Sequence, residues 1–130
     1  VPHPPPLLYR EVPMSTRDVG QHGEQLALRY LRRKGYALLC RNYRYGHYEI
    51  DLVMQDGDYV VFVEVKARTD GERFGTPAMA VGREKQRCLL LAAQGYLLEH
   101  GCAESPARFD VVEVYLAEGK IQHIVNAFWG

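Results

Sequence analysis

The chain has 130 residues, 47% hydrophobic and 25% charged, which suits one globular domain of ordinary composition. Sixteen basic residues balance sixteen acidic ones, so net charge gives no argument for nucleic-acid binding. The odd number of three cysteines, none with CxxC spacing, argues against a disulfide scaffold or a zinc knuckle and favours a reducing compartment. No segment approaches the ~20 apolar residues of a membrane span and no secretory signal is visible, so we expect a cytoplasmic protein without a membrane partner.

Charge is distributed unevenly along the chain. The stretch Glu99–Glu118 is mostly acidic. An earlier stretch is purely basic, and its members are Arg29, Arg32, Arg33, Lys34, Arg41 and Arg44. These stretches predict a basic side and an acidic side, although ordinary solvated faces would give the same pattern. A homodimer that joins two basic faces would let a neutral chain bind DNA.

The predicted elements follow the order α-β-β-β-α-β-β. Residues 1–14 are proline-rich and predict an N-terminal tail, with a single domain over 15–130. A helix capped by Ser15 or Thr16 should run to about Lys34 and end at Gly35. The remaining elements are strands at 36–45, 49–55 and 58–68, a helix at 81–100, and strands at 108–116 and 120–128. This pattern predicts an α/β fold with a five-stranded sheet.

The third predicted strand carries charges at only one of its ends. Because side chains alternate along a strand, Glu64, Lys66 and Arg68 share a face with Val60 and Phe62. The other face is apolar throughout and comprises Val61, Val63, Val65 and Ala67. Both faces are apolar early in the strand, which is typical of a central strand covered on both sides.

The turn before this strand decides which acids join the charged face. Asp56-Gly57 predicts a two-residue hairpin turn that pairs Gln55 with Asp58. That register makes Asp51 a diagonal neighbour of Glu64 on one face. It also places Glu49 directly opposite Glu64, and these like charges are destabilising unless a metal cation or a lysine lies between them.

Two carboxylates and a lysine on a half-buried surface are suited to phosphoryl chemistry. Hard oxygen ligands hold Mg²⁺, which keeps several waters and reaches substrate phosphates. A nearby lysine can orient the attacking water or offset charge in the transition state. The alternative is a buried salt bridge between Glu64 and Lys66, which would leave Asp51 and Glu49 in need of partners.

These residues resemble a known family. Asp51 followed by Glu64-x-Lys66 is similar to the D-(x)n-E-x-K signature of the PD-(D/E)xK nuclease superfamily. Over Val19 to Phe128 the chain resembles the YraN family, small bacterial proteins similar in fold to archaeal Holliday-junction resolvases. The segments that carry this resemblance are "GQHGEQLALRYLRRKGYALLCRNYR", "EIDLV", "VFVEVKAR", "FGTPAMAV", "RFDVV" and "NAF".

The resemblance implies a restriction-endonuclease-like α/β core with a mixed sheet flanked by helices. It also implies Mg²⁺ or Mn²⁺ ligands at Asp51, Glu64 and the Val65 carbonyl, and a catalytic lysine at Lys66. Glu24 matches the helical acid of the family, and its position on the apolar stripe of the first helix points it towards the sheet. The family has Gly before E-I-D where this chain has Tyr48, a side chain that would narrow substrate access or stack on a base.

Several other residues are weaker candidates for the site. Arg68, Lys85, Arg83 and Arg44 are expected phosphate contacts, and each also fits an exposed position without a role. Glu49 and Gln86 are candidate accessory residues of the site, whereas Arg108 and Asp110 are expected to form a structural pair. Tyrosines interleave with the basic stretch, which is typical of single-strand binding and also of core packing.

The leading hypothesis is a metal-dependent endonuclease that hydrolyses DNA phosphodiester bonds, with branched and single-stranded DNA as candidate substrates. One alternative is a nucleic-acid-binding module of the same fold with little or no catalysis. The other is a structural adaptor in a DNA repair or uptake complex. The set of four residues that comprises Glu24, Asp51, Glu64 and Lys66 favours the enzyme, because an adaptor has no use for a buried carboxylate cluster.

Overall fold

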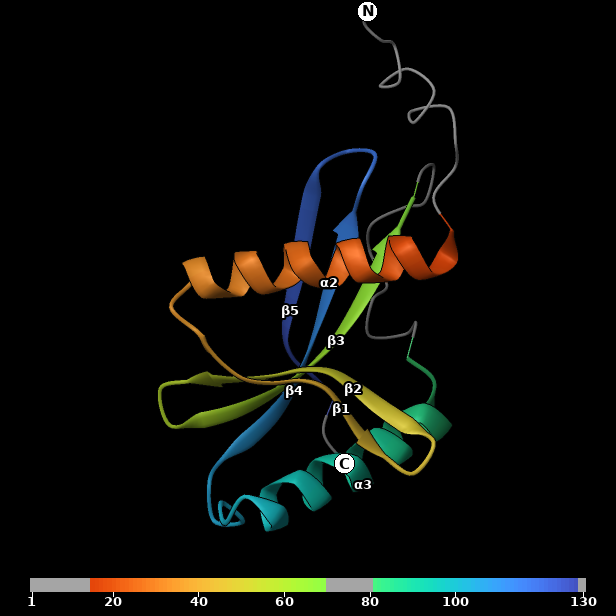
Figure 1. Cartoon of the computed structure of the whole chain (residues 1–130). Helices are drawn as coiled ribbons and strands as arrows, with labels where there is room; N and C mark the ends of the chain where they lie inside the picture. The colour runs from red at the N-terminus through yellow and green to blue at the C-terminus, as the bar shows by residue number, and fades with distance from the viewer. Residues whose placement is uncertain (1–14, 70–80, 129–130) are drawn as a thin grey trace, which may run out of the picture.

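A mixed five-stranded sheet lies between two helices in the computed structural model, which describes residues 15–69 and 81–128 (Figure 1). The elements are α2 (Thr16–Arg33), β1 (Ala37–Tyr45), β2 (Tyr48–Asp56), β3 (Tyr59–Arg68), α3 (Arg83–Glu99), β4 (Ala107–Tyr115) and β5 (Lys120–Phe128). The predicted α/β class and element order are confirmed. The predicted tail at 1–14 and the segment 70–80, with most of the FGTPAMAV motif, lie outside the described residues.

The strands are ordered β1-β2-β3-β4-β5, so β3 is central as its two apolar faces predicted. Strands β1, β2 and β3 form an antiparallel meander, and β4 pairs with β5 antiparallel. Strand β3 pairs with β4 in parallel, which requires a crossover, and α3 lies within this connection.

Helix α2 covers one face of the sheet. The Ser15 hydroxyl accepts the Asp18 N–H at 3.1 Å and caps the helix, while Gly35 ends it with a φ of 97°. Its buried side chains pack with Val61 and Val63 of β3, and they include Ala27, Leu28 and Leu31. A Cβ at Gly23 would lie 2.6 Å from the Ala67 Cβ, so the helix backbone approaches β3 closely at this position.

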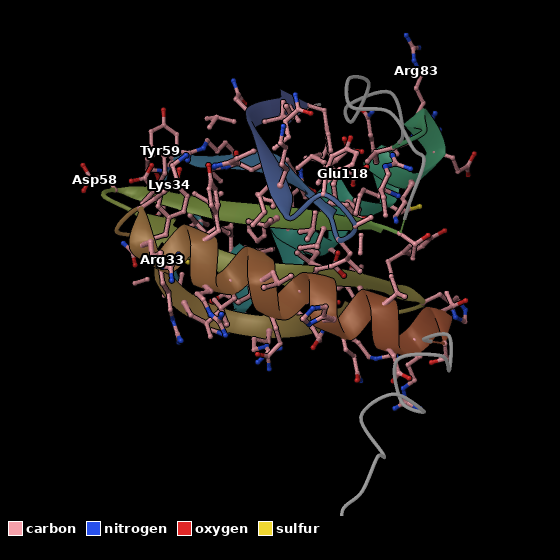
Figure 2. All side chains as sticks on the ribbon, turned by 90° about the horizontal axis from the view of Figure 1, so that it is seen from above. Arg33, Lys34, Asp58, Tyr59, Arg83 and Glu118 are labelled. Carbon is pink, nitrogen blue, oxygen red and sulfur yellow. The ribbon has the colours of Figure 1, made fainter. Side chains whose placement is uncertain are left out.

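Helix α3 covers the opposite face. Leu89, Ala93 and Tyr96 pack with Phe62 of β3 and Phe109 of β4. The two faces of β3 thus belong to two separate apolar clusters, which confirms the alternation predicted for that strand. Figure 2 labels Tyr59, at the start of β3, at one end of the molecule and Arg83, at the start of α3, at the other.

The predicted register of the β2–β3 hairpin is wrong by two residues. Asp56 pairs with Tyr59, so the two-residue turn consists of Gly57 and Asp58 rather than Asp56 and Gly57. Gly57 has a φ of 60° and takes the first turn position, where a type II′ turn requires positive φ. Glu49 therefore does not face Glu64. A shift of two residues preserves the faces of a strand, so Asp51 still belongs beside Glu64.

Among the described helices, none is long and apolar enough to cross a membrane. The three cysteines are free.

Candidate functional site

The candidate site is a gap between β2 and β3. The ladder of paired residues between these strands ends at Leu52 and Val63. Beyond this point a side chain of β2 replaces its backbone as the hydrogen-bond acceptor for β3. Oδ2 of Asp51 accepts the Val65 N–H at 2.8 Å. The N–H and C=O of one strand residue point to the same side, so the Val65 carbonyl also faces the gap. We call Asp51, Glu64 and Val65 the carboxylate gap.

Two lysines converge on Glu64 within this gap. Glu64 is only 4% exposed. The Lys85 ammonium, from the first turn of α3, donates to its Oε2. The Lys66 ammonium lies 4.0 Å from the same oxygen and is about a quarter exposed. The salt bridge between Glu64 and Lys66, which the sequence offered as the alternative to a metal site, is present, but Lys85 makes the closer contact.

The electrostatics of the gap are unfavourable for a second carboxylate. Burial, followed by the charge of Glu64, raises the pKa of Asp51 to about 8. Glu24 raises this pKa further, whereas the Val65 N–H and Lys85 lower it. A cation placed between Asp51 and Glu64 would relieve the repulsion between them.

Helix α2 supplies the third acid. Glu24 is half-buried beside the close approach of Gly23 to β3, and its Oε1 accepts the Asn42 side-chain N–H at 3.1 Å. Asn42 stands on β1 with a φ of 53°, a conformation that Asn tolerates better than most residues. The sequence analysis missed this residue. An Asn within a predicted strand was the available signal, because strands are depleted in Asn.

A strand distortion explains why α2 and α3 both reach the gap. Ile50 and Val53 of β2 both pack on the α3 side, although three residues of strict alternation would place them on opposite faces. Cys40 and Tyr43 of β1 are also three residues apart, flank Asn42, and both pack on the α3 side. Both strands therefore change phase together next to Asp51, and its side chain points into the gap between β2 and β3.

The donor set suits a hard divalent cation. Two carboxylates and a main-chain carbonyl are oxygen ligands of the kind that Mg²⁺ prefers, and Mg²⁺ takes its remaining ligands from water and substrate. Within residues 15–69 and 81–128, no group of three His, Cys, Asp or Glu side chains is placed to hold a metal by itself. A metal at Asp51 and Glu64 would thus depend on the Val65 carbonyl and water.

The peripheral candidates have varied surroundings. Arg68 donates to the buried Glu113 at 2.6 Å and 3.0 Å, so the structure gives it a partner within the fold. The Gln86 side chain donates to the Val81 carbonyl at 2.7 Å, next to the start of α3. Arg83 is exposed at that helix start. Arg44 is exposed on β1 opposite the half-buried Glu49, so these two residues are cross-strand neighbours.

A second polar cluster joins β4 and β5 to Tyr36, just before β1, and to the end of β2. Arg108 donates to Asp110 at 3.0 Å, which confirms the predicted pair, and to the Tyr36 hydroxyl and Asp56 at 2.8 Å and 3.1 Å. His123 lies 2.7 Å from Asp110 through Nε2 and was missed by the sequence analysis. We call these five residues the Asp110 cluster.

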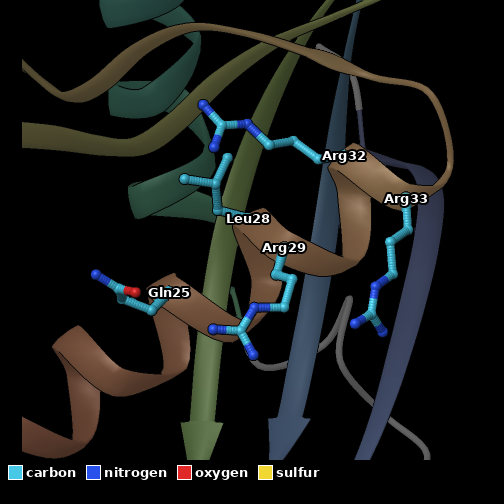
Figure 3. Close-up of a pocket in the computed structure, with 5 residues that line it drawn as sticks. All are labelled: Gln25, Leu28, Arg29, Arg32 and Arg33. Atoms are coloured by element: carbon cyan, nitrogen blue, oxygen red, sulfur yellow. The ribbon is translucent and has the colours of Figure 1, made fainter.

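The basic stretch of α2 forms its own surface. Gln25, Leu28, Arg29, Arg32 and Arg33 line a shallow pocket of about 380 Å³ along the helix (Figure 3). The three arginines are exposed, in agreement with a basic side. The carboxylate gap does not contribute to this pocket.

Comparison with known proteins places the chain in a family. The pattern of "Uncharacterised protein family UPF0102" matches residues 23–114, which include Glu24, Asp51, Glu64, Lys66 and Lys85. A UPF0102 protein of Chlorobium chlorochromatii is 45% identical over 90% of this chain and 95% of its own length. A UPF0102 protein of Symbiobacterium thermophilum is 50% identical over 76% of this chain and 83% of its own length. A UPF0102 protein of Clostridioides difficile is 40% identical over 88% of this chain and 100% of its own length. The chain therefore belongs to the UPF0102 family, the family that its motifs resemble under the name YraN.

Proposed function

We propose that this chain is a divalent-metal-dependent nuclease that hydrolyses DNA phosphodiester bonds. The observation that carries the proposal is the meeting of Asp51 and Glu64 in the gap where the β2–β3 ladder ends, with the pKa of Asp51 raised to about 8. A pair of carboxylates that repel one another in a partly buried site is a functional signal, because a fold gains no stability from it.

Each residue of the site has a distinct role in this proposal. Asp51, Glu64 and the Val65 carbonyl hold Mg²⁺ or Mn²⁺, which when bound polarises the phosphoryl oxygen and acidifies the attacking water. Lys66 points its ammonium to the partly exposed mouth of the gap, where it offsets charge that develops on the phosphate. Glu24, oriented by Asn42, accepts a proton from the water.

One contact favours a second candidate function. The Lys85 ammonium already pairs with Glu64 and supplies an internal positive charge to the gap. A chain that keeps this pairing would bind nucleic acid without cleaving it. Such a module predicts salt-sensitive binding that survives Glu64→Ala.

The test is an incubation of the purified chain with end-labelled four-way junctions, flaps, single strands and duplexes, in Mg²⁺, in Mn²⁺ and in EDTA. We expect metal-dependent cleavage of at least one substrate, reduced at least ~100-fold in Lys66→Ala because a charge-stabilising group is lost. Lys120→Ala, an exposed lysine at the start of β5, is the matched control and should cleave like the wild type. Absence of cleavage on every substrate, or undiminished cleavage by Lys66→Ala, would refute the nuclease.

A further inference from the structure

The tip of the β1–β2 hairpin presents two tyrosine rings to solvent. Tyr45 pairs with Tyr48 across a two-residue loop that begins at Gly46, and the two side chains are 46% and 38% exposed. Together with neighbouring side chains of α3 they surround an almost wholly apolar pocket of about 190 Å³. Its lining residues are Tyr45, Gly46, His47, Tyr48, Cys88 and Leu91. We call this the tyrosine pocket.

Both rings are held in place by α3. A Cβ at Gly95 would lie 2.8 Å from the Tyr45 ring, so the ring rests against the helix backbone. Glycine inside a helix costs up to ~1 kcal/mol relative to alanine, and space for this ring accounts for its presence. Cys88 of α3 lines the pocket beside Tyr48 and acts to raise the pKa of Tyr48. Rings that are already ordered lose little conformational entropy when a ligand stacks on them.

The tyrosine pocket and the carboxylate gap are built on the same two elements. Cys88 lies three residues after Lys85 on α3, which is one turn along the same side of the helix and a rise of roughly 4.5 Å. Tyr48 lies three residues before Asp51 on β2, a distance of roughly 10 Å along the strand. Figure 1 shows the β1–β2 turn beside the first turns of α3. A chain bound in the gap would therefore extend within reach of the pocket.

We propose that the tyrosine pocket binds one unpaired nucleobase of the substrate, which makes single-stranded segments the preferred substrate class. This inference rests on the proposed function. Aromatic side chains stack on any base, whereas a base within a duplex is covered by its neighbours and must leave the stack first. The substrate strand thus carries an unpaired nucleotide next to the phosphate at the gap.

The surrounding charges favour stacking as the source of affinity. No Arg or Lys is among the described residues that line the tyrosine pocket. Glu84 also acts on Tyr48 by its negative charge. The contribution of Tyr48 to binding should therefore change little with salt concentration, because it does not depend on phosphate contacts.

The test measures binding in EDTA, so that it does not depend on metal or cleavage. Fluorescence anisotropy compares a labelled single-stranded oligonucleotide with the duplex of the same sequence. We expect Tyr48→Leu to weaken single-strand binding about tenfold, since stacking contributes about 1–3 kcal/mol per base, and duplex binding less than about twofold. Tyr48→Phe keeps the ring and should bind single strands like the wild type.

Two further variants make the test specific. Leu91→Glu places a charge in the same pocket at a position that is 54% exposed, so it should weaken single-strand binding without loss of folding. Tyr59→Leu is the matched control, because Tyr59 is 43% exposed at the opposite end of the molecule from the start of α3 (Figure 2). It should leave the binding of both DNA forms unchanged.

Three results would overturn the inference. Tyr48→Leu and Leu91→Glu could bind single strands as tightly as the wild type, or could lose affinity equally for single strands and duplex. Alternatively, gel filtration could show a dimer that Tyr48→Leu dissociates, which would identify the pocket as a protein contact. If the wild type binds no DNA of any form, the proposed function fails as well, whereas normal binding by both variants removes only the tyrosine pocket.

Discussion

Asp51 and Asp110 are carboxylates of the same sheet with opposite electrostatics. Burial and Glu64 raise the pKa of Asp51 to about 8. Burial also acts to raise the pKa of Asp110, but hydrogen bonds from His123, Arg108 and the Asn126 N–H outweigh it and lower that pKa. Burial alone therefore does not decide the direction of the pKa shift. The donors and charges around the carboxylate do.

The Asp110 cluster satisfies its carboxylate on both oxygens. Arg108 donates to both of them, Asn126 donates to Oδ1, and His123 binds Oδ2. Because an ionised Asp110 cannot donate, Nε2 of His123 carries the proton and Nδ1 accepts from Lys34 at 2.9 Å. The two acids of the carboxylate gap instead have Glu24 as a third acid nearby, and two lysines lie close to Glu64. The Asp110 carboxylate is thus surrounded by donors, whereas Asp51 lies against a second carboxylate that raises its pKa.

The largest expected effect that separates the two clusters is on catalysis. Glu64→Gln removes a proposed metal ligand, so we expect cleavage to fall by ~10²–10⁴-fold, equivalent to about 3–5 kcal/mol of transition-state stabilisation. Cleavage rates on the best substrate, measured with folded protein, test this. Asp110→Asn should alter cleavage only through the fraction of unfolded protein. An equal catalytic loss in both variants would contradict the division into functional and structural acids.

The next largest effect is on the free energy of unfolding, and here the larger loss is expected in the Asp110 cluster. Asp110→Asn leaves the buried Arg108 without its main carboxylate, and loss of one partner of a buried ion pair costs about 3–5 kcal/mol. Urea unfolding at pH 7 measures this free energy. Asp58→Asn, an exposed carboxylate in the β2–β3 turn, is the control and should stay within about 0.5 kcal/mol of the wild type. A loss below 1 kcal/mol in Asp110→Asn would show that the network is not structural.

A smaller effect is a gain in stability that depends on pH. The pKa of Asp51 rises from 3.8 in the unfolded chain to about 8 in the fold, so its contribution is fully present below pH 3.8 and is lost as pH rises to about 8. Above this range the fold carries the free-energy cost of an ionised, partly buried Asp51, and Asp51→Asn removes that cost. Because Asp51 is only half-buried, we expect a gain of about 2 kcal/mol for the metal-free variant at pH 8 and no gain near pH 4.

Thermal unfolding with and without Mn²⁺ sharpens the same comparison. The wild type should be stabilised by about 1.4 kcal/mol at a metal concentration ten times the Kd, whereas Asp51→Asn should respond weakly because a ligand is missing. If Asp51→Asn is less stable than the wild type at pH 8 without metal, the carboxylate gap is a satisfied network like the Asp110 cluster.

Periodicity and turn residues sufficed to predict the element order and the central position of β3. The expectation that Asp51 lies beside Glu64 rested on strict alternation and on a register that is wrong by two residues, whereas β2 changes phase next to Asp51, whose carboxylate accepts the Val65 N–H. Asp56-Gly57 and Gly57-Asp58 are both acceptable two-residue turns by local preference. The choice between them was made by pairing along the whole hairpin.

The contacts that give the site its chemistry came only from tertiary structure. The pairing of Lys85 with Glu64 joins residues 21 apart, and that of Asn42 with Glu24 joins residues 18 apart. No periodicity encodes such contacts, because they depend on where β2 and β3 separate and how closely α2 approaches β3. The sequence by itself determined the order of the elements and the central strand, because both follow from local periodicity. The tertiary structure decided which carboxylate is satisfied, because the pKa of a carboxylate depends on burial and on donors brought from distant segments.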